Sequence, residues 1–127
     1  MMNLSAKLFL SLGACSGALA VMLGAFGAHG LKDKLSEKML ANWMTGVDYH
    51  FYHTFALLVV GLLALKFQSG ALTAGGWSFL AGILIFSGSL YIMALTGITR
   101  LGAITPIGGL LFIAGWVLLA TAVLKVR

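Results

Sequence analysis

The residues best suited to chemistry in this chain are its three histidines, His29, His50 and His53, with Asp48 close to two of them. Imidazoles bind transition metals, carry protons near neutral pH, or hydrogen-bond to buried polar partners. His50 and His53 are three residues apart, so on a helix they share a side about one turn apart. Which of these three kinds of chemistry applies depends on the environment that the rest of the chain builds around them.

That environment is a lipid bilayer. The chain is 61% hydrophobic and only 9% charged, with a mean hydropathy of +1.05, whereas soluble domains are roughly 45–50% apolar and about 25% charged. Eight Lys and Arg residues outnumber three Asp and Glu. In a membrane protein this excess indicates contact with anionic lipid headgroups rather than with nucleic acid.

Four long apolar segments approach the roughly 20 residues that a helix needs to cross a bilayer. Because long continuous runs favour helices over barrel strands, the chain is predicted to be all-α, an integral membrane bundle of four transmembrane helices in one domain, 1–127. Thr105 and Pro106 are typical of a helix start, with Thr105 as the cap. The predicted spans are 8–28, 49–65, 77–97 and 106–124.

The link between the first two spans has a pattern of its own. Apolar residues recur at helical spacing over 35–47 while lysine and other polar residues take the opposite side, which predicts an amphipathic helix between spans one and two. Such a helix can lie in the membrane interface, anchored by Trp43, or it can pack as a connecting helix against the bundle. It can also continue through Gly46 into span two, and the sequence leaves these alternatives open.

The topology brings the polar residues to one membrane face. Basic residues divide four against four between the two faces, so the positive-inside rule is silent, and the acids mildly favour cytoplasmic termini. From their helix ends, His53 is expected on the order of 7 Å inside the membrane and Tyr91 about 9 Å inside. We therefore predict a polar layer near one face, composed of His29, Asp48, His53, Tyr91 and Arg100.

Three interpretations of this layer remain. It can be structural, with interfacial aromatic and imidazole groups and an internal hydrogen bond. It can be a proton or substrate relay, although no acid or base is expected at mid-membrane. It can hold a metal or haem through His29, His50 and His53, but the glutamate–histidine spacing typical of such helical sites is absent, so no cofactor is assigned.

Small residues recur at spacings that allow helices to approach closely. Serines beside them can add hydrogen bonds between helices. The residues predicted to serve helix packing are Gly13, Gly17, Gly24, Gly27, Gly30, Gly82, Ser87, Gly88, Ser89, Gly108, Gly109 and Gly115.

Four stretches together resemble one known family. They are LGAFGAHGL (23–31), YHFYHTFALL (49–58), FSGSLYIMALTG (86–97) and ITPIGGLLFIAGW (104–116). In this order they resemble the bacterial membrane family called domain of unknown function 423, which is similar to eukaryotic transmembrane protein 256. The positions carried over are Gly24, Gly27, His29, Gly30, Tyr49, His53, Ser87, Gly88, Ser89, Tyr91, Thr105, Pro106, Gly108, Gly109 and Trp116, without His50.

The resemblance implies a four-helix protein of the bacterial inner membrane and supplies no catalytic residue. No nucleophile, base and orienting acid are recognisably arranged, so an enzyme is not predicted. We expect a module that self-associates as a homo-oligomer, or that binds lipid or a membrane-protein partner. The alternatives are a small transporter or channel with a polar vestibule, and a metal- or haem-binding subunit.

Overall fold

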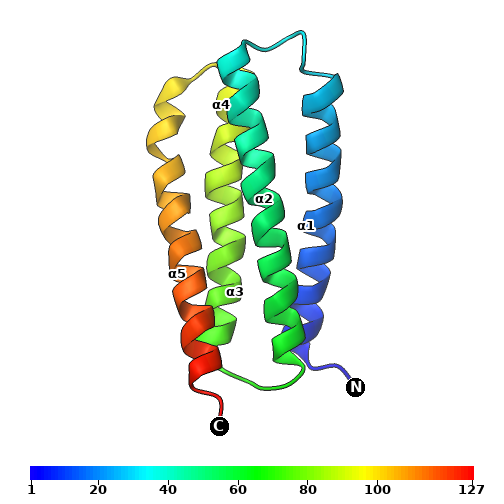
Figure 1. The fold of residues 1–127 in the computed structure, drawn as a ribbon, viewed down its shortest axis with the longest axis vertical. Coiled ribbons are helices and arrows are strands. Elements are labelled where there is room, and N and C mark those ends of the chain that lie inside the picture. Colours follow the sequence, from blue (N-terminus) through cyan, green and yellow to red (C-terminus); the bar gives the residue numbers. More distant parts are fainter.

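The computed structural model describes residues 1–127 as helices running up and down along one axis (Figure 1). Four of its helical segments are long and apolar enough to cross a membrane, which confirms the predicted class. The third span is one helix of two α-helical parts joined by a five-residue π-helical turn, Ile83–Ser87. The α-helices are α1 (Leu4–His29), α2 (Glu37–Ala64), α3 (Gly70–Gly82), α4 (Gly88–Thr96) and α5 (Thr105–Leu124).

Three of the helices begin earlier than the apolar runs predicted, because polar caps fix their first turns. The side chains of Asn3, Ser36 and Ser69 accept hydrogen bonds from the first-turn amides of α1, α2 and α3. At α5, helix formation begins at Thr105 without a side-chain cap. The prediction that Thr105 caps this helix is wrong, since its hydroxyl lies 2.6 Å from the hydroxyl of Ser89 instead.

The amphipathic segment is part of the second span rather than a separate helix. Residues 37–47 form the first turns of α2, which continues through Gly46 without a break. Trp43 is buried, and its indole Nε1 donates to the Leu23 carbonyl oxygen of α1 at 2.9 Å. Trp43 therefore fastens α2 to α1 and is not an anchor in the membrane interface.

The helices form an open row in which chain order is spatial order. α1 packs against α2, α2 against the α3–α4 helix, and α5 against α3 and the π turn. In Figure 1, α1 and α5 lie at opposite edges, with α2 and the α3–α4 helix between them. The backbone of α5 does not approach α2 closely, nor that of α1 the α3–α4 helix, so side chains make these contacts and each of the two gaps leaves a lateral groove.

Most of the small residues lie where helices meet. Added Cβ atoms would fall within 3 Å of the neighbouring helix at five positions of the predicted set: Gly13 (Leu58), Gly27 (Trp43), Gly82 (Phe112), Gly108 (Phe86) and Gly115 (Phe79). Gly17 and Gly24 also face α2, at 3.4 and 3.3 Å. Gly88 has open space around it, Gly109 is 3.9 Å from Phe86, and the nearest atoms to Gly30 belong to Phe26 of its own helix.

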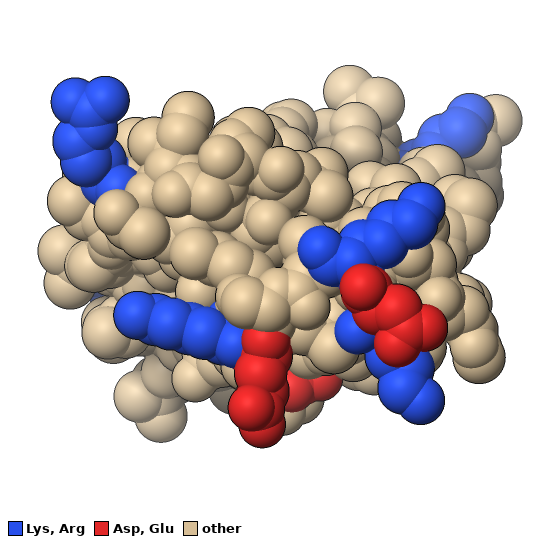
Figure 2. Space-filling view, turned by 90° about the horizontal axis from the view of Figure 1, so that it is seen from above, with Lys and Arg blue, Asp and Glu red and all other residues tan.

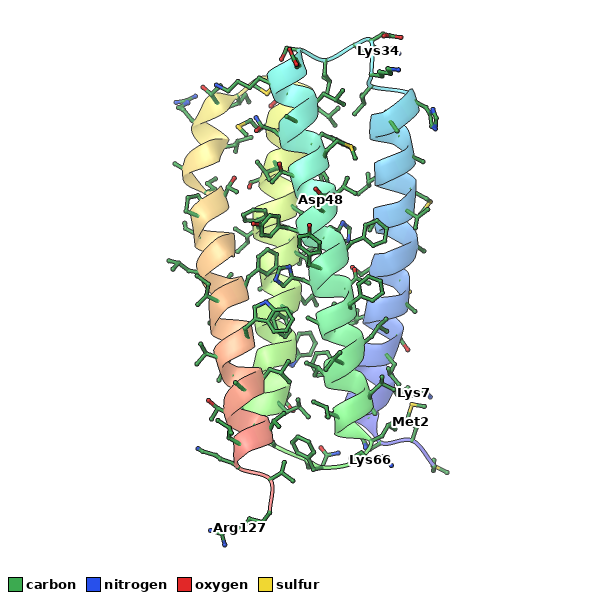
Figure 3. All side chains as sticks on the ribbon, viewed as in Figure 1. Met2, Lys7, Lys34, Asp48, Lys66 and Arg127 are labelled. Atoms are coloured by element: carbon green, nitrogen blue, oxygen red, sulfur yellow. The ribbon has the colours of Figure 1, made fainter.

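Charged residues mark the two ends of the row. Lys7, Lys66 and Arg127 lie at the end with the termini, and Lys34 lies at the other (Figure 3). Seen from the Lys34 end, basic side chains are spread around the edge with acidic ones beside some of them (Figure 2). The apolar length between these two ends is what a bilayer must cover.

Candidate functional site

His50 joins three helices through a hydrogen-bonded chain. It is 2% exposed, with Nδ1 3.0 Å from the Tyr91 hydroxyl of α4 and Nε2 3.0 Å from the Ser16 hydroxyl of α1. The Ser16 hydroxyl lies a further 2.6 Å from the hydroxyl of Thr54. Buried polar groups in lipid need such partners, so this chain fixes α1, α2 and α4 relative to one another. We call these four residues the His50 chain.

His53 joins α2 to α5, about 60° around the same helix from His50. Trp116 Nε1 donates to His53 Nε2 at 3.1 Å, and His53 Nδ1 lies 2.7 Å from the Tyr49 carbonyl oxygen. An indole N–H can only donate, so Nε2 is the acceptor and Nδ1 carries the proton. The imidazole also stacks on Phe112, with ring centroids 3.5 Å apart and planes 6° apart. This group is the His53–Trp116 bridge.

The predicted polar layer therefore does not form as one cluster. Tyr91 pairs with His50 and not with His53, because residues three apart on a helix differ by about 60° in direction. Because α2 has α1 and α4 on one flank and α5 on the other, a difference of about 60° is enough for His50 and His53 to face different helices. His29, Asp48 and Arg100 are exposed and make no contact with Tyr91 or His53 through side-chain hydrogen bonds.

Several residues at the site were not predicted from the sequence. Ser16 and Thr54 look like ordinary small polar residues of transmembrane helices, and His50 was outside the resemblance. Ser87, by contrast, was predicted to serve helix packing, and from the π turn it donates to the Gly46 carbonyl oxygen of α2 at 2.7 Å. The usable signal was helical spacing, since His50 and Thr54 are four residues apart and share one side of α2.

The larger groove lies between α2 and α5, with the His53–Trp116 bridge along its floor. Its volume is about 730 Å³, within the roughly 300–1,000 Å³ of small-molecule sites. Pro106 and Trp116, both in its lining, are ten residues apart, so the groove extends about 15 Å along α5. It is lined by Tyr49, Tyr52, His53, Phe86, Pro106, Gly109, Leu110, Phe112, Ile113 and Trp116. We call it the α2–α5 groove.

The depth of these residues follows from helix rise. Asp48 is eighteen residues from Lys66, about 27 Å, and a hydrocarbon core is about 30 Å thick. With Lys66 at one edge of that core, Asp48 lies near the other edge and His53 about 10 Å inside it. The α2–α5 groove thus runs from the membrane edge toward mid-bilayer. Figure 3 shows Asp48 well below Lys34.

The histidines are poorly disposed to bind a metal. The only lone pair of the His53 ring accepts the Trp116 N–H, and both nitrogens of His50 are engaged by hydroxyls. A metal would have to break one of these bonds. No group of three His, Cys, Asp or Glu side chains is positioned to share an ion.

The fold and composition define a multi-pass membrane protein with four helical spans. The chain belongs to the family described as "Protein of unknown function (DUF423)", which it matches over residues 23–109. It is 52% identical to UPF0382 membrane protein YwdK of Bacillus subtilis (strain 168) over 120 residues, covering 94% of this chain and 98% of that protein.

A UPF0382 membrane protein of Staphylococcus epidermidis (strain ATCC 12228) is 51% identical over 119 residues, covering 94% of this chain and 97% of the relative. UPF0382 membrane protein SAB0533 of Staphylococcus aureus is 50% identical with the same coverage. No solved structure matches the chain. These bacterial membrane relatives place the protein in the plasma membrane.

Proposed function

We propose that this protein is a non-enzymatic membrane module that holds one acyl chain of a membrane lipid in the α2–α5 groove. The observation that carries the proposal is the groove itself, a mainly apolar opening of about 730 Å³ between α2 and α5 on the side of the protein. In a bilayer the molecules next to such an opening are lipid chains.

The dimensions of the groove suit a lipid of one leaflet. Half of a 30 Å hydrocarbon core is about 15 Å, which matches the distance along α5 from Pro106 to Trp116. The end at Pro106 lies near the membrane edge, where a headgroup would sit. The end at Trp116 lies near mid-bilayer, where an acyl chain ends.

The polar groups of the groove favour a lipid chain over a water path. Both ring nitrogens of His53 have partners within the protein, and its ring face stacks on Phe112. The remaining lining is mainly aromatic and aliphatic. A transporter vestibule would need polar groups free to replace the hydration of a solute, and this lining offers few.

Filling the groove tests the proposal. Gly109 lines the groove and its nearest neighbour would be 3.9 Å from an added Cβ, so Gly109→Leu should fill the groove without displacing a helix. Gly88→Leu is the matched comparison, because Gly88 is equally open but lines the smaller groove between α1 and the α3–α4 helix, so it adds the same side chain outside the α2–α5 groove. Lipid that stays with the purified protein is counted by native mass spectrometry.

The wild-type protein and the Gly88→Leu variant should each retain lipid in a fixed ratio, and the Gly109→Leu variant should lose one molecule. Equal retention by all three proteins would contradict the proposal, as would a wild-type protein that carries no lipid. Circular dichroism spectra of the variants establish that each is folded.

A further inference from the structure

Asp48 is a carboxylate on the outer, lipid-facing side of α2. The exposed residues of this side recur at intervals of three and four: Thr45, Asp48, Tyr52, Phe55, Val59 and Leu62. Apart from Thr45, the other members are aromatic or aliphatic. By helix rise, Asp48 lies only about 3 Å inside the hydrocarbon edge opposite Lys66, just below the level of lipid glycerol and headgroups.

The chain provides this carboxylate with no basic partner on its own helix. The nearest basic residues of α2 and its end are Lys38, ten residues before, and Lys66, eighteen residues after. His50 points to the other side of α2, where Tyr91 and Ser16 occupy its nitrogens. An ionisable residue within a membrane span is costly unless it meets a counter-charge, so the partner of Asp48 should come from outside the chain.

Asp48 also lies next to two residues that line the α2–α5 groove. It precedes Tyr49 in the sequence and lies one turn before Tyr52, and both tyrosines line the groove. Their rings are 5.5 Å apart in an edge-on arrangement, and they are 40% and 57% exposed. The faces of aromatic rings attract cations. A carboxylate and two tyrosine rings thus lie next to one another along the half of the groove that is nearer to the membrane edge.

We propose that Asp48, Tyr49 and Tyr52 form a headgroup site for an ammonium-bearing phospholipid, of the phosphatidylethanolamine class, whose acyl chain lies in the α2–α5 groove. This inference rests on the proposed function and adds the chemistry of the headgroup. Asp48 supplies the counter-charge, and the tyrosine rings supply a surface for the ammonium. The basic side chain of Arg100, which is exposed in the 3₁₀ turn before α5, lies at the same end of the protein and suits the lipid phosphate.

The test compares lipids that differ only in the headgroup. The purified protein is placed in mixed micelles with phosphatidylethanolamine, phosphatidylglycerol or diacylglycerol of identical acyl chains, and bound lipid is measured by native mass spectrometry. The proteins are wild type, Asp48→Asn, and Glu37→Gln as a matched control. Glu37 is an exposed acid at the start of α2, far from the groove lining.

Wild type and Glu37→Gln should retain phosphatidylethanolamine about two- to fivefold better than either other lipid, the ratio that a cation–π contact of about 0.5–1 kcal/mol gives. Asp48→Asn should lower this preference, since only the tyrosine rings would then hold the ammonium. Tyr52→Leu, which keeps an apolar side chain there, should reduce the preference in the same direction.

The possible results separate this inference from the proposed function. Equal retention of the three lipids by wild type would overturn the headgroup site, and the groove would remain a proposed site for an acyl chain. Retention of diacylglycerol equal to that of phosphatidylethanolamine would also overturn it, since the preference would then be repulsion of an anionic lipid. Loss of all lipid from wild type would overturn both. An Asp48→Asn protein that loses an oligomer present in wild type would assign the carboxylate to a second copy of the chain.

Discussion

The two sides of α2 meet their neighbours in opposite ways. Toward α1 the helix approaches closely, because glycines on both helices remove side chains from the contact: Gly13 and Gly27 on α1, and Gly61 on α2. Toward α5 no glycine pair brings the backbones together, and the aromatic rings of His53, Phe112 and Trp116 bridge the gap instead.

The difference shows how one helix can be both a packing surface and the wall of a binding groove. The glycines of α5 that make close contacts, Gly108 and Gly115, face Phe86 and Phe79 of the third span and not α2. α5 is thus held tightly on one side only. The space left on its other side is the α2–α5 groove, which we propose as a lipid site.

The largest expected effect comes from adding a methyl group to the close contact between α1 and α2. In Gly61→Ala the new Cβ would meet the Leu10 backbone nitrogen at 2.9 Å and its side chain at 2.7 Å. We expect the free energy of unfolding to fall by about 1–3 kcal/mol, as for overpacked cores. Reversible unfolding in mixed micelles, followed by circular dichroism, measures it.

Gly109→Ala is the counterpart on the groove side, where the added Cβ makes an ordinary 3.9 Å contact. This variant should be as stable as wild type or more stable by up to about 1 kcal/mol, since alanine favours helices over glycine. If both substitutions destabilise the protein equally, the contrast between a closed and an open side of α2 is wrong.

Removing the His53–Trp116 bridge should have an intermediate effect. His53→Ala leaves the Trp116 N–H without its acceptor and removes a ring stacked on Phe112, so we expect a loss of about 2 kcal/mol. Trp116→Phe, which removes only the hydrogen bond and part of the ring, should cost less. The same unfolding experiment applies, and an unchanged His53→Ala protein would show that the bridge does not hold α5.

The smallest effect tests whether the two histidine groups are independent. Tyr91→Phe removes one hydroxyl of the His50 chain and should cost about 0.6 kcal/mol, with an upper bound of about 1.7 kcal/mol. In double-mutant cycles, Tyr91→Phe should couple with Ser16→Ala, because His50 contacts both hydroxyls. It should not couple with Trp116→Phe, and a coupling energy above about 0.5 kcal/mol there would mean one connected network.

The sequence was sufficient to predict the fold class, because the membrane restricts a chain of this composition to spanning helices. It was less informative about boundaries. Apolar runs mark the part of a helix inside lipid, whereas Ser36 and Ser69 start α2 and α3 well before those runs. Helix length and span length are different quantities in this protein.

The candidate site was harder to predict, because direction around a helix depends on how the neighbours are placed. His53 and Tyr91 have similar depth, which made a contact between them plausible, but α2 directs His53 to α5 and His50 to α4 and α1. The sequence does not show which helices surround α2, so it cannot predict that His50 and His53 point to different neighbours. Ser16 and Thr54 could be recognised only after their helices were placed side by side.

The π turn at Ile83–Ser87 sets the angular phase of everything after it in the third span. A π turn accommodates one more residue than an α-helix in about the same rise, and one residue corresponds to about 100° of rotation. Deleting one residue within it would turn Ser89 and Tyr91 away from Thr105 and His50, while the α3 face toward α5 kept its orientation. Because of the extra residue in the π turn, the α3 part of this helix packs mainly against α5, and the α4 part packs against α2.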